Sequence, residues 1–420
     1  MTNIAHLFES RSTMESHQMD FLAETQVVFH CHHFNLFFDQ TIDDALGPER
    51  GTELRVEAGH KSAYHLLRGL FRSGRYRTPI ERLDAATTLL RAMGHGRVDS
   101  MTNRSGGTAT GDYLHYGFGW QEKYGDAVKR NHCADAFAAG FLSAANELAY
   151  DLDLGSLATR ESRCIATGER QCHFEVEPRR QRLLTSNVHP STAEATLPAS
   201  FEGEFEDRIE AITKGLREFL SGVQGDERGV IDAFGVLVTM HLADYYNHLA
   251  NDTLRVVATE KPHAQDAFRS LLVESGQVCS FHTFGGVLAS PEWDGMVGAP
   301  SGEPSEVVVG GLALARALGF GRWSLEDWIP EKQLVLGSPG TYESLFSRLA
   351  PMSPHRAPSG IFPGAALGIM SLAHRVDWAN KQPLDAALYR QLVSNNPWKV
   401  EQTHSIVAGD DRDRVVVSLK

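Results

Sequence analysis

Long apolar runs are missing from this sequence: no stretch approaches the roughly 20 apolar residues that a membrane-spanning helix needs. The polar segment 1–20 also lacks the apolar core of a signal peptide, so we expect a cytoplasmic protein with no membrane partner. Basic residues are in the minority, since 40 Lys and Arg stand against 53 Asp and Glu and the formal net charge is −13. Nucleic acid is therefore not expected as a partner, because phosphate binding needs a basic face.

Several catalytic and cofactor motifs are absent as well. The sequence has no Gly-x-x-x-x-Gly-Lys-Ser/Thr loop, no Gly-x-Ser-x-Gly elbow and no His-Glu-x-x-His pair. Gly94-x-Gly96 is not followed by the third glycine of a dinucleotide loop, and we interpret it as a turn. Five cysteines are an odd number for a disulfide framework, so reduced thiols are the simpler interpretation.

What the sequence does contain is an internal repeat. Four segments of the first half match four of the second in the same order: 32–42 with 244–254, 87–100 with 312–325, 138–148 with 366–376, and 163–177 with 404–418. The two copies share glycines, since Gly94 and Gly96 align with Gly319 and Gly321. Chance similarity between apolar helices is the alternative explanation.

The repeat predicts two diverged copies of one α/β domain (α+β in arrangement), packed as a pseudo-dimer within the chain. The first copy spans 1–180 and the second 204–420, and each opens with a helical pattern such as that of 205–220. The Ser-, Thr-, Ala- and Pro-rich segment 181–203 is expected to be a linker. A homodimer is a further possibility that the sequence leaves open.

Three cysteines lie close together in the last third of the first copy. Glu161 precedes Cys164 by three residues, Cys172 follows it by eight, and Gly168 between them allows a tight turn. Cys133, on the amphipathic segment 132–150, offers a further thiolate. Thiolates with a carboxylate suit Zn²⁺, and a closed shell of protein ligands would make the ion structural. The alternative is that these cysteines are small buried apolar residues.

The second copy has lost all of these residues. Its aligned positions are Ile361, Gln402, Ser405 and Asp413. Joint loss is what we expect if the four residues form one site, although random divergence could produce the same pattern.

The motif Glu-x-x-Cys-x-x-x-Gly-x-x-x-Cys-x-Phe, formed here by Glu161, Cys164, Gly168, Cys172 and Phe174, resembles the closing motif of the 4-vinyl-reductase domain family. That family includes the sensor domains of aromatic-catabolism activators, and the resemblance covers roughly residues 20–178. It implies a zinc ion bound by Glu161, Cys164, Cys172 and one upstream cysteine. Here that upstream residue is Cys133, with His132 as the alternative. The resemblance also implies an enclosed apolar pocket for a small, often aromatic, molecule beside the zinc.

The segment 27–42 is unusually rich in histidine and phenylalanine. On a predicted helix, His30 and His33 share one side with Phe34. His30, His32 and His33 are therefore candidates for acid–base catalysis, or His30 and His33 for a second metal. The alternative is that the phenylalanines belong to the core and the histidines lie at its edge.

A second aromatic segment, 110–125, offers candidates for binding a ligand. Tyr113, His115 and Trp120, together with Asn35, have the apolar bodies and polar tips that are typical of small-molecule pockets. Ordinary hairpin packing would use the same residue types.

Three functions remain open from the sequence. The first is a zinc-containing protein that binds a small apolar or aromatic molecule. The second is a metal- or His-dependent enzyme of small-molecule metabolism that uses the His-rich segment. The third is an assembly scaffold, and the fold alone does not decide among them.

Overall fold

The computed structural model describes residues 2–179, 183, 204–349 and 359–420. The predicted linker 181–203 lies outside the described residues except for Leu183. The elements of the first half are α1 (Ile4–Leu7), β1 (Ser12–Met14), β2 (Met19–Leu22), β3 (Thr25–Cys31), α2 (His32–Leu46), α3 (Pro48–Phe71), α4 (Pro79–Ala92), β4 (Arg97–Asn103), β5 (Gly106–Asp112), α5 (His115–Tyr124), α6 (Ala136–Ala149), β6 (Leu157–Arg163), the 3₁₀ turn η1 (Ile165–Thr167) and β7 (Cys172–Pro178).

The second half has more helices. Its elements are α7 (Glu204–Ser221), β8 (Ile231–Ala233), β9 (Val236–Leu242), α8 (Ala243–Glu260), η3 (Pro262–Ala264), α9 (Gln265–Cys279), the π-helical η4 (Ser280–Phe284), α10 (Gly285–Leu288), α11 (Pro291–Met296), α12 (Pro304–Ala317), β10 (Ser324–Ile329), β11 (Gln333–Ser338), α13 (Tyr342–Leu349), α14 (Ile361–Arg375), α15 (Ala386–Ser394), β12 (Trp398–His404), η5 (Ile406–Ala408) and β13 (Asp413–Leu419).

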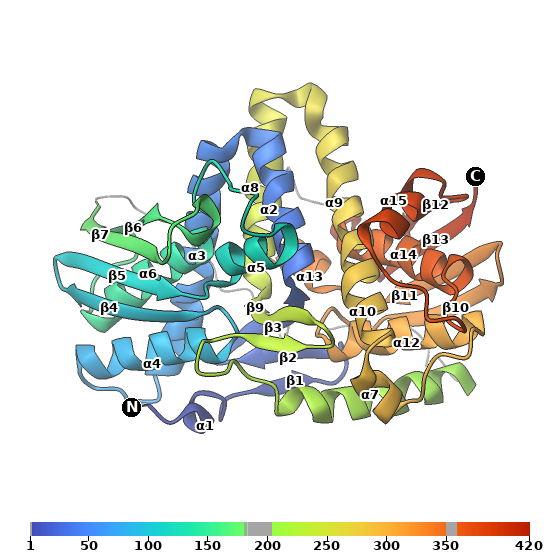
Figure 1. Cartoon of the computed structure of the whole chain (residues 1–420), viewed down its shortest axis with the longest axis horizontal. Coiled ribbons are helices and arrows are strands. Elements are labelled where there is room, and N and C mark those ends of the chain that lie inside the picture. Colours follow the sequence, from blue (N-terminus) through green and yellow to red (C-terminus); the bar gives the residue numbers. More distant parts are fainter. Residues whose placement is uncertain (1, 180–182, 184–203, 350–358) are drawn as a thin grey trace.

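Each half contains a four-stranded antiparallel sheet of the same design. The strand orders are β4-β5-β7-β6 and β10-β11-β13-β12, and the two sheets lie on opposite sides of the molecule (Figure 1). In both, two strands are followed by helices (α5 and α6, or α13, α14 and α15) before the last two strands complete the sheet. The mixed helices and antiparallel sheets confirm an α+β fold. That a duplication produced the two halves stays a prediction.

A third sheet, of order β1-β2-β3-β9-β8, joins the halves (Figure 1). β3 pairs antiparallel with β9, so that Phe29 lies opposite Met240. Each half also sends a turn onto the other half's strand: the N–H of Phe29 donates to the carbonyl of Leu318, and that of Met240 donates to the carbonyl of Met93. The boundary predicted between the copies is therefore crossed by shared backbone hydrogen bonds.

The shared glycines have a clear role at these crossings. Gly94 and Gly319 both have positive φ, and a Cβ on either would lie 2.8 Å from a backbone oxygen of the other half's strand, that of Val238 or Val27. A side chain does not fit at either point. The predicted turns are confirmed.

The His-rich segment is not one helix, and that prediction was wrong. Residues up to Cys31 form β3, and α2 begins only at His32. The β-branched and aromatic residues Val27, Val28 and Phe29 pair with β9 as a fully buried strand, and an apolar run of this kind has no period that separates strand from helix. His30 and His33 consequently do not share a helix face.

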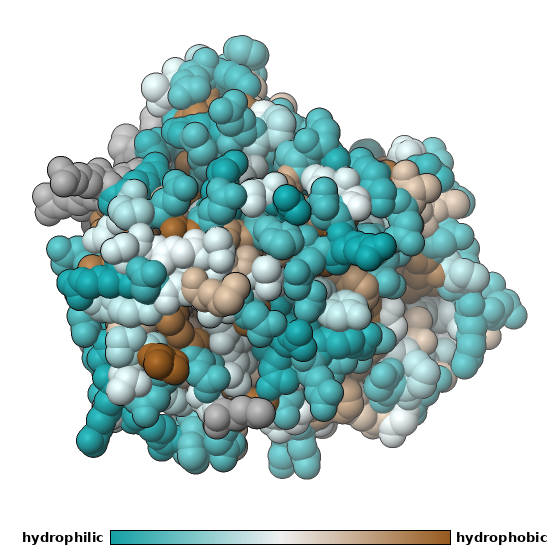
Figure 2. All heavy atoms as spheres, turned by 60° about the vertical axis from the view of Figure 1, so that its left-hand side comes forward, coloured by the Kyte–Doolittle hydropathy of each residue, from teal (hydrophilic) through white to brown (hydrophobic). Residues whose placement is uncertain are grey.

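The predicted helix at the start of the second copy is confirmed as α7, which packs on α12 and buries Ile209, Leu216 and Leu220. In the first copy, the helix described before β1 is the four-residue α1. Within the described ranges, no helix is long and apolar enough to cross a membrane. On the face shown in Figure 2, which brings the β4–β7 side forward, apolar residues lie in scattered small groups.

Candidate metal centre and adjoining pocket

Two thiols meet where β6 leads into β7. Cys164 precedes the 3₁₀ turn η1 and Cys172 is the first residue of β7. Gly168 ends the turn in the left-handed region, with φ of +103°, and so reverses the chain between them. As a result the two Sγ atoms lie 3.9 Å apart, as the predicted turn requires.

Two carboxylates complete the cluster. Asp135 lies just before α6, and its Oδ2 is 3.8 Å from Sγ of Cys164 and 3.6 Å from Sγ of Cys172. Glu161 comes from β6, where its Oε2 accepts a hydrogen bond of 2.8 Å from the N–H of Asp135. Each of the four side chains offers one ligand atom, and these atoms all lie within 4.8 Å of one another. We call these four residues the Cys/Asp/Glu cluster.

Burying the charged side chains of the Cys/Asp/Glu cluster without a cation costs free energy. Burial raises the pKa of both Asp135 and Glu161 well above the usual range, because a charged carboxylate loses its water there. The buried Oε1 of Glu161 has no hydrogen-bond partner. A Cβ on Gly117 would lie 2.7 Å from Oδ2 of Asp135, so only glycine leaves this space open. Two sulfur and two oxygen donors with an orphaned carboxylate oxygen fit Zn²⁺.

Backbone N–H groups already orient the ligand atoms. Asp135 accepts from Tyr116 and Gly117 rather than capping its own helix, at 3.0–3.3 Å. Sγ of Cys164 accepts from Ala134 at 3.3 Å, and Sγ of Cys172 accepts from the N–H that follows Cys164 at 3.4 Å. Such bonds stabilise anionic donors and fix their direction.

The two residues predicted as the upstream ligand, Cys133 and His132, are not among the four residues of the cluster. Cys133 is partly exposed and outside the closest four, although a hydrogen bond to Cys164 and burial raise the pKa of its thiol. The ring of His132 is directed elsewhere, and its Nε2 lies 3.0 Å from Oδ2 of Asp43. Sequence reasoning missed Asp135, although a carboxylate two residues from a suspected ligand was a usable signal. Which residue is the fourth ligand stays a prediction.

The second half fills the same place with hydrogen bonds. Oδ1 of Asp413 accepts from Nε2 of Gln402 at 3.2 Å and from the N–H of Ile406 at 3.1 Å, and its Oδ2 accepts from Ser344. Burial raises the pKa of Asp413 to about 6. Gln402 and Asp413, which the sequence repeat aligns with Glu161 and Cys172, are therefore hydrogen-bonded to each other.

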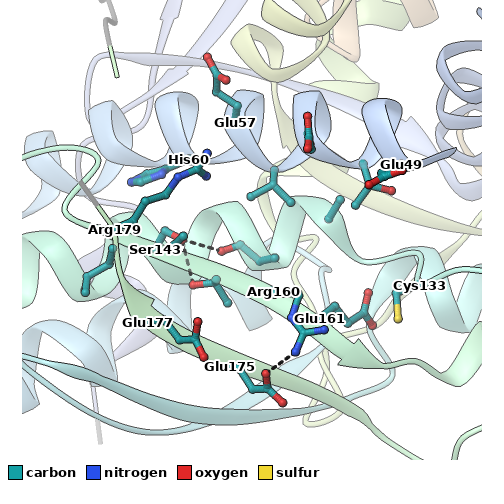
Figure 3. A pocket seen from close by; sticks show the side chains of 18 of the residues that line it. Glu49, Glu57, His60, Cys133, Ser143, Arg160, Glu161, Glu175, Glu177 and Arg179 are labelled. Atoms are coloured by element: carbon teal, nitrogen blue, oxygen red, sulfur yellow. Dashed lines mark hydrogen bonds and ion pairs between the residues drawn. The ribbon is translucent and has the colours of Figure 1, made fainter. Parts of the chain in front are cut away.

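A pocket of about 780 Å³ adjoins the Cys/Asp/Glu cluster. It lies between α3 and α6 on one side and β6 and β7 on the other (Figure 3). Cys133 and Glu161 lie at one end, and His60 and Arg179 lie at the opposite end (Figure 3). Its apolar lining includes Val56, Ala136, Ala139, Leu157 and Leu183.

The buried wall of the pocket also contains polar groups. Nε2 of His60 lies 2.7 Å from Oε2 of Glu147, whose other oxygen accepts from the N–H of Leu157 at 2.8 Å. Ser143 donates to Oγ1 of Thr159 at 2.9 Å (Figure 3). The fold positions these groups, and none of them was a predicted site residue.

The histidines proposed for catalysis lie elsewhere. His30 is fully buried and stacks on Phe34, with ring centroids 3.9 Å apart. His33 stacks on His282 of η4, with ring centroids 4.0 Å apart, and contacts the tilted ring of His32 at the same distance. None of the three lines the pocket beside the cluster.

Burial lowers the pKa of each of these rings. It lowers the pKa of His32 to about 4 and that of His282 to about 3, and it lowers the pKa of His33 as well. These rings are consequently neutral near pH 7. Nδ1 of His32 and of His33 is buried without a hydrogen-bond partner.

The four predicted ligand-binding residues do not form one site. Nδ2 of Asn35 lies 2.8 Å from Nε2 of His115, and its Oδ1 accepts from the hydroxyl of Tyr246 at 2.6 Å, all in the buried centre. Tyr113 is 41% exposed, and Trp120 donates to the carbonyl of Val128. None of the four predicted residues lines the pocket beside the cluster.

Comparison with known proteins finds a structural similarity but no family. No protein-family model matches the chain, and no curated protein matches its sequence. Among solved structures, the chain is similar to the phenol-responsive sensory domain of the transcription activator PoxR, crystallised with phenol. The identity is 17%, the alignment covers 42% of this chain and 88% of that one, and the TM-score is 0.35. Similarity of this extent does not establish a shared ligand or function.

Proposed function

We propose that the first half binds a small, mainly apolar molecule in the pocket between α3, α6, β6 and β7, and that a zinc ion in the Cys/Asp/Glu cluster holds one end of that pocket in shape. One observation carries the proposal: Glu161 belongs both to the cluster and to the pocket wall. Concave, largely apolar sites with a few placed polar groups are where small molecules bind.

Asp135, Glu161, Cys164 and Cys172 would be the protein ligands. A zinc ion bound by four side chains has no open position, so it would supply cross-linking of the fold rather than reaction chemistry. The chain's own residues then do the rest: Asp135 ties α6 to the N–H groups at the start of α5, and Glu161 ties β6 to Asp135.

Elemental analysis of the purified protein tests the metal. We expect about one zinc per chain, lost in a Cys164→Ser/Cys172→Ser variant together with thermal stability. A Cys31→Ser/Cys279→Ser variant is the matched control, because both cysteines are buried outside the cluster. A wild-type protein without zinc, or a cluster variant that keeps it, would contradict the metal assignment.

Ligand-observed ¹⁹F NMR tests the pocket with 4-fluorobenzyl alcohol, a neutral apolar probe. We expect its resonance to broaden with the wild-type protein. We expect no broadening with Val56→Trp, which places an indole in the cavity from the partly exposed face of α3. Equal broadening with both proteins would show binding elsewhere and refute the assignment of the pocket.

Neither alternative has an observation of this kind behind it. Acid–base chemistry on His30, His32 and His33 would need a cavity beside them, and these residues do not line the pocket that adjoins the cluster. A scaffold would need a broad apolar surface, and the face in Figure 2 has only scattered apolar groups.

A further inference from the structure

The charges around the pocket are strongly unequal. Six glutamates and three arginines contribute to its lining. Two of the arginines are already neutralised within the lining, Arg50 by Glu53 and Arg160 by Glu175, each at 2.6 Å. Arg179 is the remaining arginine, and it lies at the end away from the cluster (Figure 3). Among the glutamates, Glu57 is paired with Lys61 at 2.6 Å.

The end of the pocket near the cluster is the more acidic one. Glu49 lies at that end with Cys133 and Glu161 (Figure 3), and no ion pair involves Glu49 among the described residues. With zinc bound, two thiolates and two carboxylates would carry four negative charges against the two positive charges of the ion, a formal charge of −2. One of those negative charges is that of Glu161, which already belongs to the lining. A concave site lined by one sign of charge attracts the opposite sign.

At the opposite end the lining includes the imidazole of His60, which can form a hydrogen bond. His60 is 3% exposed, and Glu147 takes only its Nε2. Its Nδ1 has no hydrogen bond among the described residues. Between the two ends the wall is mainly aliphatic, with Ser143 and Thr159 hydrogen-bonded to each other, and no phenylalanine, tyrosine or tryptophan lines the pocket. The cavity therefore presents an acidic end, a mainly apolar middle and the imidazole ring of His60 at the opposite end.

We infer that the natural ligand is an apolar amine whose protonated nitrogen lies at the Glu49 end beside the cluster, with its hydrocarbon body along Val56, Ala139 and Leu157. This inference rests on the proposed function. A carboxylate or phosphate ligand of the same size would face Glu49 and the negative cluster and be repelled.

Three probes of similar shape and different charge test the inference on the 420-residue chain loaded with zinc: 4-fluorobenzylamine, 4-fluorobenzyl alcohol and 4-fluorobenzoate. Their binding is measured by ¹⁹F NMR titration. We expect the amine to bind about tenfold more tightly than the benzoate at low salt, with the alcohol between them. Because the interaction is electrostatic, the preference should shrink on raising the ionic strength from about 0.05 M to about 0.5 M.

Charge-removing variants locate the effect. A Glu49→Gln variant should lower the preference for amine over benzoate about threefold. A Glu401→Gln variant, altered at an exposed residue of β12 in the other half, should keep the wild-type preference. A preference that is unchanged in the Glu49→Gln variant would overturn the inference.

The outcomes separate the two proposals. Equal or tighter binding of the benzoate, abolished by Val56→Trp, would overturn the inference and leave the pocket as the ligand site. Binding of all three probes that Val56→Trp does not alter would overturn the proposed function itself.

Discussion

We expect the buried histidines His32, His33 and His282 to lower the stability of the folded protein in acid, and replacing His282 by Phe to reduce that loss by a calculable amount. A ring of similar shape preserves the stacking on His33. Burial and the nearby charges of Lys123 and His32 lower the pKa of His282 from 6.5 to about 3 in the folded protein. As the pH falls below 6.5 the unfolded chain therefore takes up a proton that the folded chain refuses.

The sign and size follow from linkage. Above pH 6.5 neither state is protonated and His282 leaves the stability unchanged; between pH 6.5 and about 3 the folded state loses stability as the pH falls. At pH 5 the unfolded histidine is about 97% protonated, which costs the folded state about 2 kcal/mol relative to pH 8. His282 is largely buried, so solvent screening removes little of this. A loss of this size is a substantial part of a typical folding free energy of roughly 5–15 kcal/mol.

Urea denaturation followed by tryptophan fluorescence at pH 8 and pH 5 measures the effect. We expect the loss of unfolding free energy between the two pH values to be about 2 kcal/mol smaller in His282→Phe than in the wild type, whatever the variant's stability at pH 8. Carboxylates whose pKa burial raises, Asp244 and Glu343 to about 7, act in the opposite direction but equally in both proteins. Exposed His263, changed to Gln, is the control. Losses that agree within about 0.5 kcal/mol between the variant and the wild type would refute the reasoning.

Three further predictions concern single side chains. Asp135→Asn should lose most of the bound zinc while Cys133→Ser keeps it, as measured by elemental analysis; the reverse result would make Cys133 the fourth ligand. Gly168→Ala should lower the unfolding free energy by about 1 kcal/mol because of its positive φ. By contrast, Gly215→Ala, in the open interior of α7, should raise it by about 0.5–1 kcal/mol in the same urea titration. Asn35→Ala should lower the unfolding free energy by about 3 kcal/mol in the same titration. The change leaves the buried hydroxyl of Tyr246 and the ring of His115 without their hydrogen-bond partner. A decrease below about 1 kcal/mol would contradict that account.

Local patterns were enough for the parts of the fold that depend on neighbours in sequence. The turn at Gly94 and the chain reversal at Gly168 follow from backbone conformations that favour glycine, and α7 follows from its amphipathic period. The spacing of Glu161, Cys164 and Cys172 likewise predicted side chains that the structure brings together, because one short turn connects them.

The periodicity of apolar residues alone did not predict the boundary between β3 and α2. A buried strand and a buried helix are apolar on every side, so the residues before His32 have no pattern that distinguishes them. The choice was made by β9, which lies more than 200 residues later and supplies the hydrogen bonds of the central sheet.

The sequence by itself therefore determined the α+β class, the glycine turns, and the thiols and carboxylate that one turn gathers. Only the tertiary structure decided that Asp135 joins those thiols, that Asn35 meets His115 rather than Trp120, and that α3 closes a pocket over β6 and β7. Contacts of this second kind join residues from separate elements, whose distance depends on the packing of helices and sheets. The spacing of residues along the chain carries no record of it.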